Sequence, residues 1–115
     1  MTETRASYKV SASKYGNKKV EFAGILFDSK AELRRFHELK LLERAGEITN
    51  LELQPRFDLV VEGVKCGFYK GDFRYVDTRT GKEVVEDVKG VKTPVYRLKR
   101  KLVRAIYGVD VVEVS

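Results

Sequence analysis

The chain has 115 residues, a length that suits one domain with a single hydrophobic core. Its 23 lysines and arginines outnumber 17 aspartates and glutamates, and the formal net charge of +6 favours an anionic partner, most commonly nucleic acid. The single cysteine, Cys66, excludes an internal disulfide, and Cys66 with the single histidine, His37, is too small a set for a cysteine–histidine zinc site.

The sequence shows neither a signal peptide nor an apolar run close to the roughly 20 residues that a membrane span needs. We therefore expect a cytoplasmic protein with no membrane partner. The alternative interpretation of the positive charge is that it only keeps a small interaction protein in solution.

Hydrophobic periodicity and capping residues divide the chain into helices and strands. The first 14 residues are polar and basic without periodicity, and we interpret them as a flexible basic arm ahead of one domain over residues 15–115. The predicted elements, in chain order, are a hairpin over residues 17–27, a helix over 30–45, strands over 51–53 and 57–61, a hairpin within 71–90, a helix over 94–107 and a strand over 109–114. This order predicts an α/β domain with a mixed β-sheet flanked by helices.

The predicted hairpin GDFRYVDTRTGKEVVEDVKG places two acidic residues opposite each other on neighbouring strands. If its turn is Thr-Arg-Thr-Gly, Asp77 pairs with Lys82 and Asp72 falls directly opposite Asp87. Opposed β-carbons lie about 4.5–5.5 Å apart, and two like charges at that distance destabilise a sheet unless something neutralises them. A divalent cation does so, and oxygen ligands suit Mg²⁺ or Mn²⁺. The alternatives are a solvated polar face, or a register slipped by one residue that puts Glu86 opposite Asp72.

Two further side chains fit such a metal site. Lys89 lies two residues beyond Asp87 on the same strand face, where an ammonium group can hold a water or offset charge on a phosphate. At about 100° per residue, Glu32 falls beside Phe36 on the apolar face of the first helix, and a buried carboxylate needs a partner. Ser29 and Glu32 also form a capping box, so this glutamate has either a metal-binding or a capping role.

These acids and their order in the chain resemble the PD-(D/E)XK nuclease superfamily. The segments KYGNKKVEFAGILFDSKAE, ITNLELQPRF, YKGDFRYVD and VVEDVKG look like a small phage-borne nuclease family that is similar to Holliday-junction resolvases, and the resemblance spans residues 14–114. It implies a restriction-endonuclease-like core and metal-dependent hydrolysis of phosphodiester bonds in DNA, with branched DNA as the substrate. It also implies the cytoplasm of a bacterial host cell and, because two cuts on opposite strands need two active sites, a homodimer.

The resemblance assigns a role to the acids and the lysine. Asp72, Asp87 and Lys89 match the first catalytic aspartate and the (D/E)-x-K pair, with Gly71 where the superfamily's name has proline. Glu32 matches a helical glutamate that often joins the metal site.

Three neighbouring positions are accessory candidates. The Val88 backbone carbonyl is expected as a further ligand of Mg²⁺ or Mn²⁺. Gln54 matches a glutamine found near such sites, or is a solvated strand-end residue. Glu86 is adjacent to Asp87 in the chain, but strand alternation points its side chain to the other face.

The second predicted helix is expected to contact the phosphate backbone of DNA. Its predicted core face consists of Val95, Leu98, Leu102, Ala105 and Ile106. The candidate DNA-binding residues are Lys92, Tyr96, Lys99, Arg100, Lys101 and Arg104. An ordinary solvated face is the alternative for each cation, and a non-catalytic nucleic-acid-binding module on the same fold is the alternative for the whole chain.

Overall fold

The computed structural model describes residues 9–12, 18–88 and 92–115. The chain divides into two units, residues 1–38 and 39–115, and each unit is described by itself. The boundary falls inside the first helix, α1 (Lys30–Arg44), which begins in the first unit and ends in the second.

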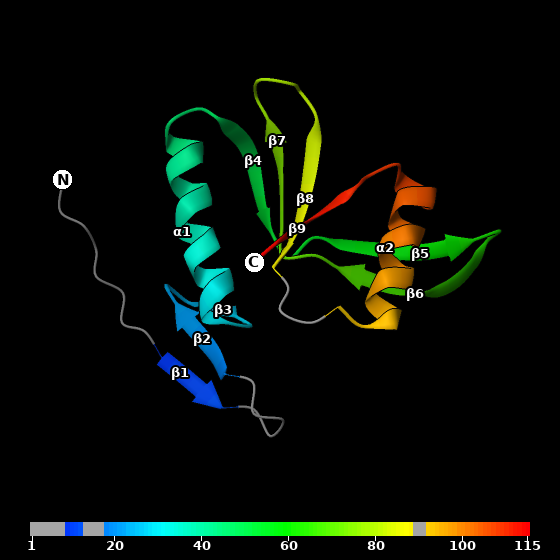
Figure 1. The fold of residues 1–115 in the computed structure, drawn as a ribbon, viewed down its shortest axis with the longest axis horizontal. Helices are drawn as coiled ribbons and strands as arrows, with labels where there is room; N and C mark the ends of the chain where they lie inside the picture. The colour runs from blue at the N-terminus through cyan, green and yellow to red at the C-terminus, as the bar shows by residue number, and fades with distance from the viewer. Residues whose placement is uncertain (1–8, 13–17, 89–91) are drawn as a thin grey trace. The chain divides into compact units, whose positions relative to one another are not determined.

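The first unit contains a three-stranded antiparallel sheet in the order β1 (Lys9–Ala12), β2 (Lys18–Phe22) and β3 (Ile25–Phe27) (Figure 1). Ala23 and Gly24 have φ values of 53° and 80°, as a two-residue hairpin turn requires, so the predicted hairpin is confirmed. Strand β1 corrects the prediction of a flexible arm for residues 9–12 only, because these four residues pair with β2. A run this short and polar carries too little periodicity to distinguish a strand from a loop. The rest of the predicted arm lies outside the described residues.

Helix α1 begins and ends within one residue of the predicted bounds. The Ser29 hydroxyl accepts the Glu32 backbone N–H at 3.1 Å, which satisfies one of the unpaired donors of the first turn. Gly46, at φ 79°, follows the last turn in the left-handed conformation that glycine favours. In the first unit, the Phe36 ring of α1 packs against the Phe27 ring of β3, with ring centroids 5.2 Å apart.

The second unit is built on a four-stranded sheet. Its strand order is β4 (Ile48–Leu53), β7 (Phe73–Asp77), β8 (Glu83–Val88) and β9 (Val111–Val114). The β4–β7 and β7–β8 pairs are antiparallel, whereas β8 and β9 are parallel, with α2 (Pro94–Tyr107) in the connection between them. The predicted mixed sheet is therefore confirmed.

A two-stranded ribbon, β5 (Arg56–Val61) and β6 (Val64–Lys70), extends from the second unit (Figure 1). Strand β6 was not predicted. The sequence signal for this hairpin was Gly63, because glycine favours the positive φ of a two-residue turn. In the structure Glu62 and Gly63 form that turn between the strands, with φ values of 49° and 79°.

Helix α2 has the predicted bounds, with Thr93 as its N-cap and Gly108 as its C-cap. Its core face differs from the prediction. Tyr96 and Val103 are buried, whereas Val95 and Leu98 are 62% and 58% exposed. The apolar stripe of α2 is wider than the surface available to cover it, and the ribbon and β9 cover the arc that carries Tyr96 and Val103.

One hydrophobic core cluster of the second unit joins α2 to both sheets. Its buried members are Phe57, Leu59, Tyr69, Val85, Tyr96, Val103 and Val111. The described residues thus form a mixed α/β fold, and none of the helices in those ranges is long and apolar enough to cross a membrane.

Candidate functional site

The β7–β8 hairpin has the predicted register. Phe73 lies opposite Glu86, and the Asp77 N–H donates to the Lys82 carbonyl at 2.9 Å. Continued by one residue beyond β7, this register places Asp72 across from Asp87. The Asp72 N–H donates to the Glu86 carbonyl at 2.9 Å, which ties Asp72 to the end of β8.

Both aspartates are held by hydrogen bonds within the second unit. The Val88 N–H donates to Asp72 Oδ2 at 2.6 Å, and the Tyr69 phenol donates to Asp87 Oδ2. Asp87 is 3% exposed. Burial, and next the adjacent Asp87 carboxylate, raise the pKa of Tyr69, so its phenol remains a donor across the physiological range. Two oxygen-rich side chains are thereby fixed at neighbouring strand ends, a donor set that suits Mg²⁺ or Mn²⁺.

The backbone on either side of Asp72 requires a glycine rather than a proline at position 71. The Gly71 N–H donates to the Pro55 carbonyl at 2.9 Å, a bond that proline cannot make. A β-carbon at Gly71 would lie 3.1 Å from Val85 Cγ1 and 3.4 Å from Pro55 Cγ. Proline at position 71 would therefore lose a hydrogen bond and crowd Val85 and Pro55.

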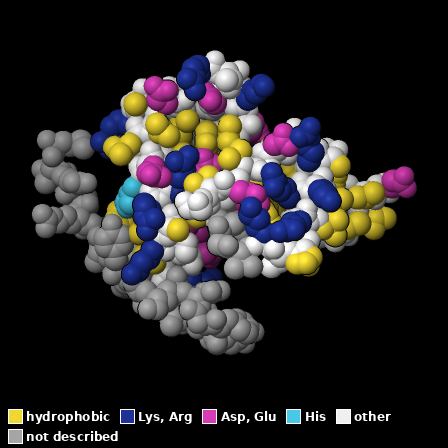
Figure 2. All heavy atoms as spheres, in the orientation of Figure 1, with side chains coloured by type: hydrophobic (Ala, Val, Ile, Leu, Met, Phe, Trp, Pro, Cys, Tyr) yellow, Lys and Arg dark blue, Asp and Glu magenta, His cyan; other side chains and the backbone are white. Residues whose placement is uncertain are grey.

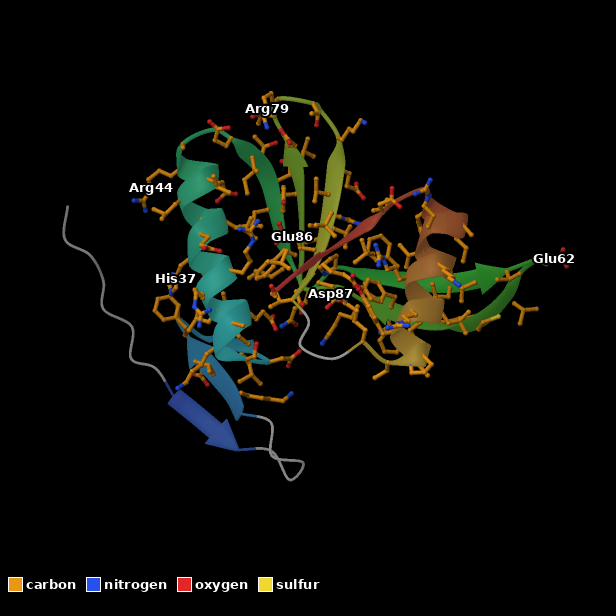
Figure 3. All side chains as sticks on the ribbon, in the orientation of Figure 1. His37, Arg44, Glu62, Arg79, Glu86 and Asp87 are labelled. Carbon is orange, nitrogen blue, oxygen red and sulfur yellow. The ribbon has the colours of Figure 1, made fainter. Side chains whose placement is uncertain are left out.

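Glu86 lies on the opposite sheet face, as strand alternation predicted. Its side chain is 1% exposed and accepts a hydrogen bond from the Tyr75 phenol. Figure 3 labels Glu86 and Asp87 as successive residues near the end of β8. Glu86 is therefore part of the packing on the Phe73 and Tyr75 face and lies away from the aspartate pair.

The aspartate pair belongs to a row of polar residues that crosses the sheet. Leu53 pairs with Phe73, so Gln54 follows beside Asp72, and the Gln54 N–H donates to the Asp72 carbonyl at 2.9 Å. On the other side, Asp87 pairs with Glu113 of β9. Glu113 was not predicted as a site residue, because its position depends on the parallel β8–β9 register, which a single sequence does not specify.

Glu113 is the centre of a charged network. Its Oε1 lies 3.1 Å from Lys92 Nζ and 3.2 Å from an Arg100 guanidinium nitrogen. The neighbouring Tyr96 phenol, and next Lys92, lower the pKa of Glu113. Burial, and next this carboxylate, raise the pKa of Tyr96.

A groove of about 590 Å³ runs along this edge of the second unit and is called the basic groove below. Its lining residues are Lys92, Arg97, Arg100, Lys101, Arg104, Asp110, Val111 and Glu113. Figure 2 shows Lys and Arg side chains gathered over α2 on the visible face. The groove brings together four of the six predicted DNA-binding residues, together with Arg97 of the same helix.

The other two predicted DNA-binding residues lie elsewhere. Tyr96 is 6% exposed and its ring packs in the core near Tyr69, which corrects its prediction as a DNA contact. Its ring is part of the core of the second unit. Lys99 lies over the Phe68 ring, with Nζ 5.4 Å from the ring centroid, and lines a separate cavity.

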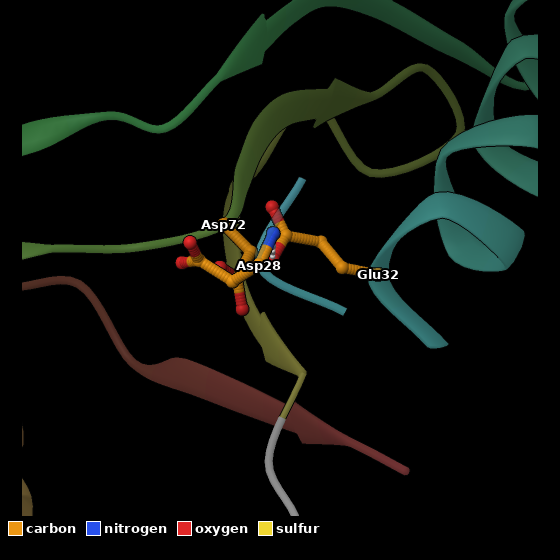
Figure 4. Close-up of side chains that lie close together, drawn as sticks. All are labelled: Asp28, Glu32 and Asp72. Atoms are coloured by element: carbon orange, nitrogen blue, oxygen red, sulfur yellow. Dashed lines mark hydrogen bonds between the residues drawn. The ribbon is translucent and has the colours of Figure 1, made fainter. Parts of the chain in front are cut away.

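The remaining predicted catalytic residues are Lys89 and Glu32. Lys89 falls outside the described residues. In the first unit, Figure 4 shows Glu32 extending from the first turn of α1, with Asp28 just before the helix. Glu32 Oε2 accepts the Asp28 N–H at 3.2 Å, so the predicted capping role is confirmed, with the bond one residue earlier than in the usual capping box. Glu32 is 3% exposed, as its position on the apolar helix face predicted.

The second unit is thus a small mixed α/β fold with a fixed pair of aspartates. The next strand carries Glu113, which pairs with Asp87 and lines the basic groove. The chain belongs to the family described as "Protein of unknown function (DUF1064)", whose family model matches residues 12–112. No curated protein and no solved structure matches the chain. The family's description assigns no activity.

Proposed function

We propose that this chain is a metal-dependent DNA endonuclease of the PD-(D/E)XK type, selective for branched DNA. The observation that carries the proposal is the aspartate pair of the β7–β8 hairpin, Asp72 and Asp87, each with one oxygen fixed by a hydrogen bond. The order of helix, antiparallel strands, helix and parallel strand also agrees with a restriction-endonuclease-like core, which is part of the proposal.

In this proposal Asp72, Asp87 and the Val88 carbonyl hold a divalent cation, Mg²⁺ or Mn²⁺. When bound, such an ion lowers the pKa of its water and neutralises charge that develops on the phosphate. Tyr69 and the Val88 N–H hold the aspartates in place, so that little reorganisation is needed at binding. The sequence resemblance alone assigns two further roles: Glu32 as an additional ligand and Lys89 as the cation that positions the water.

The proposed substrate follows from charge. The surplus of cations on α2 suits a phosphate backbone, which carries no sequence information of its own. We therefore propose recognition of DNA shape, by a homodimer that makes two cuts. The second candidate function is a non-catalytic DNA-binding module, which the basic groove alone would support.

A cleavage panel tests the proposal. Purified protein is incubated with four-way junctions, flaps, single strands and linear duplex, in Mg²⁺, in Mn²⁺ and in chelator. Metal-dependent cutting of branched substrates is the expected result. If the protein binds these DNAs but cuts none of them with either metal, the non-catalytic alternative replaces the enzyme.

Tyr69→Phe is expected to weaken metal binding about tenfold, because it removes the donor that orients Asp87. Isothermal titration with Mn²⁺ measures the effect. Tyr107→Phe is the matched control, since its phenol also donates a hydrogen bond, to the Asp58 carbonyl at 2.8 Å. Equal Mn²⁺ affinities for the two variants would show that Tyr69 has no part in metal binding.

Glu32→Gln separates the two roles of that residue. The amide oxygen can still accept the Asp28 N–H, so the melting temperature should change little, whereas loss of the charge should weaken Mn²⁺ binding. Ser29→Ala is the comparison: it removes the Glu32 N–H acceptor and should cost about 1 kcal/mol of stability without changing Mn²⁺ affinity. Unchanged Mn²⁺ affinity in Glu32→Gln would limit this residue to capping.

A further inference from the structure

The basic groove combines a high density of cations with two acids. Five lysine and arginine side chains and two carboxylates line it, so the formal charge of the lining is +3. The cations come from α2 and the residues just before it, and the acids from the region of β9. A concave surface with this surplus attracts polyanions.

The two acids differ in how firmly they are held. Asp110 pairs with Arg104, and both side chains are more than 60% exposed, so this pair is largely solvated. Glu113 is 20% exposed, and its Oε1 pairs with both Lys92 and Arg100. Glu113 is therefore the less solvated of the two acids and joins two cations, whereas Asp110 joins one.

Glu113 also connects the groove to the aspartate pair. Glu113 and Asp87 are register partners on β9 and β8, so their side chains leave the same sheet face side by side. Lys92 and Arg100 are 47% and 44% exposed, and arginine keeps further N–H donors when one carboxylate oxygen is bound. The two cations are thus held by the carboxylate whose register partner is Asp87, and both line the groove.

We propose that the basic groove binds a backbone phosphate of DNA next to the phosphate that is cut, and that Glu113 is the positioning residue that holds Lys92 and Arg100 for it. The inference deepens the proposed function, because it takes DNA as the partner. It does not require cleavage, since the cations bind phosphate without a metal. Glu113 contributes by fixing two long side chains before DNA arrives, which reduces the ordering cost of binding.

The groove is tested first, with a labelled DNA duplex and fluorescence anisotropy in chelator. Arg100→Ala should weaken binding about tenfold and lower the slope of log K against log salt by about one. Arg79→Ala removes the same charge from the tip of the β7–β8 turn, which Figure 3 shows at the far end of the hairpin from Asp87. This control should change the Kd less than about twofold. Equal effects of the two variants would overturn the groove as the binding site.

The role of Glu113 is tested by whether DNA affinity rises or falls in two further variants. Glu113→Gln and Asp110→Asn each remove one negative charge from the same groove. Electrostatics alone predicts tighter binding for both. We expect about twofold tighter binding for Asp110→Asn and about fivefold weaker binding for Glu113→Gln, because two positioned side chains become free. Tighter binding of Glu113→Gln would overturn its positioning role.

These measurements separate the inference from the proposed function. They are made in chelator, so they do not depend on metal binding or cleavage. If the protein is inactive but still shows the Arg100 and Glu113 effects, the groove assignment stands and the enzyme proposal is wrong. If the protein is active but lacks these effects, the enzyme proposal stands and the groove assignment is wrong.

Discussion

Asp87→Asn is expected to lower metal-dependent cleavage by about a thousandfold while leaving DNA binding in chelator nearly unchanged. An asparagine at this position can still accept the Tyr69 hydrogen bond, so the local structure should persist. It loses the negative charge that, with Asp72, favours a divalent cation. In thermal melts, wild-type protein should gain stability on addition of Mn²⁺, and Asp87→Asn should lose that gain.

Glu86→Gln is the matched control for Asp87→Asn. It makes the same change of charge at the adjacent residue, but the side chain lies on the opposite face with Tyr75. At a temperature where both variants are folded, Glu86→Gln should retain cleavage and the Mn²⁺-induced rise in melting temperature. The site assignment would be wrong if Asp87→Asn cleaved as well as wild type, or if the two variants lost activity equally.

The hairpin register could be predicted because the sequence specifies it locally. A four-residue turn ending in Gly81, which has a φ of 72°, fixes the pairing of Asp77 with Lys82. Strand alternation then places every side chain up to Asp72 and Asp87. The same locality explains why the bounds of α2 were predicted, since Thr93 and Gly108 cap it from adjacent positions.

The parts that were missed depend on contacts between distant segments. Tyr69 can donate to Asp87 because the ribbon and β8 share one core cluster, in which Tyr69 lies with Val85. Glu113 lies beside Asp87 through a parallel pairing across a helical connection. The buried arc of α2 was mispredicted for a similar reason: apolar residues lie on adjacent arcs of the helix, and only the packed surface selects between them.

Tyr75→Phe is expected to lower stability by about 2 kcal/mol, because it removes a donor from the buried Glu86 carboxyl group. For a chain of this size, the melting temperature should fall by about 8 °C. Chemical unfolding followed by circular dichroism measures the free energy, and cleavage should be unchanged at temperatures where the variant is folded. A stability change under about 0.5 kcal/mol would show that this hydrogen bond adds little to folding.

The double variant Tyr75→Phe with Glu86→Leu distinguishes a structural pair from a functional one. Removing one partner leaves a buried polar group with fewer hydrogen bonds. Replacing both partners with apolar side chains leaves no buried polar group that needs a hydrogen bond. The double variant should therefore regain at least half of the stability lost in Tyr75→Phe. It should also keep full cleavage activity, because this face of β8 carries packing and the opposite face carries Asp87. If the double variant instead lost cleavage while folded, the division of roles between the two faces of β8 would be wrong.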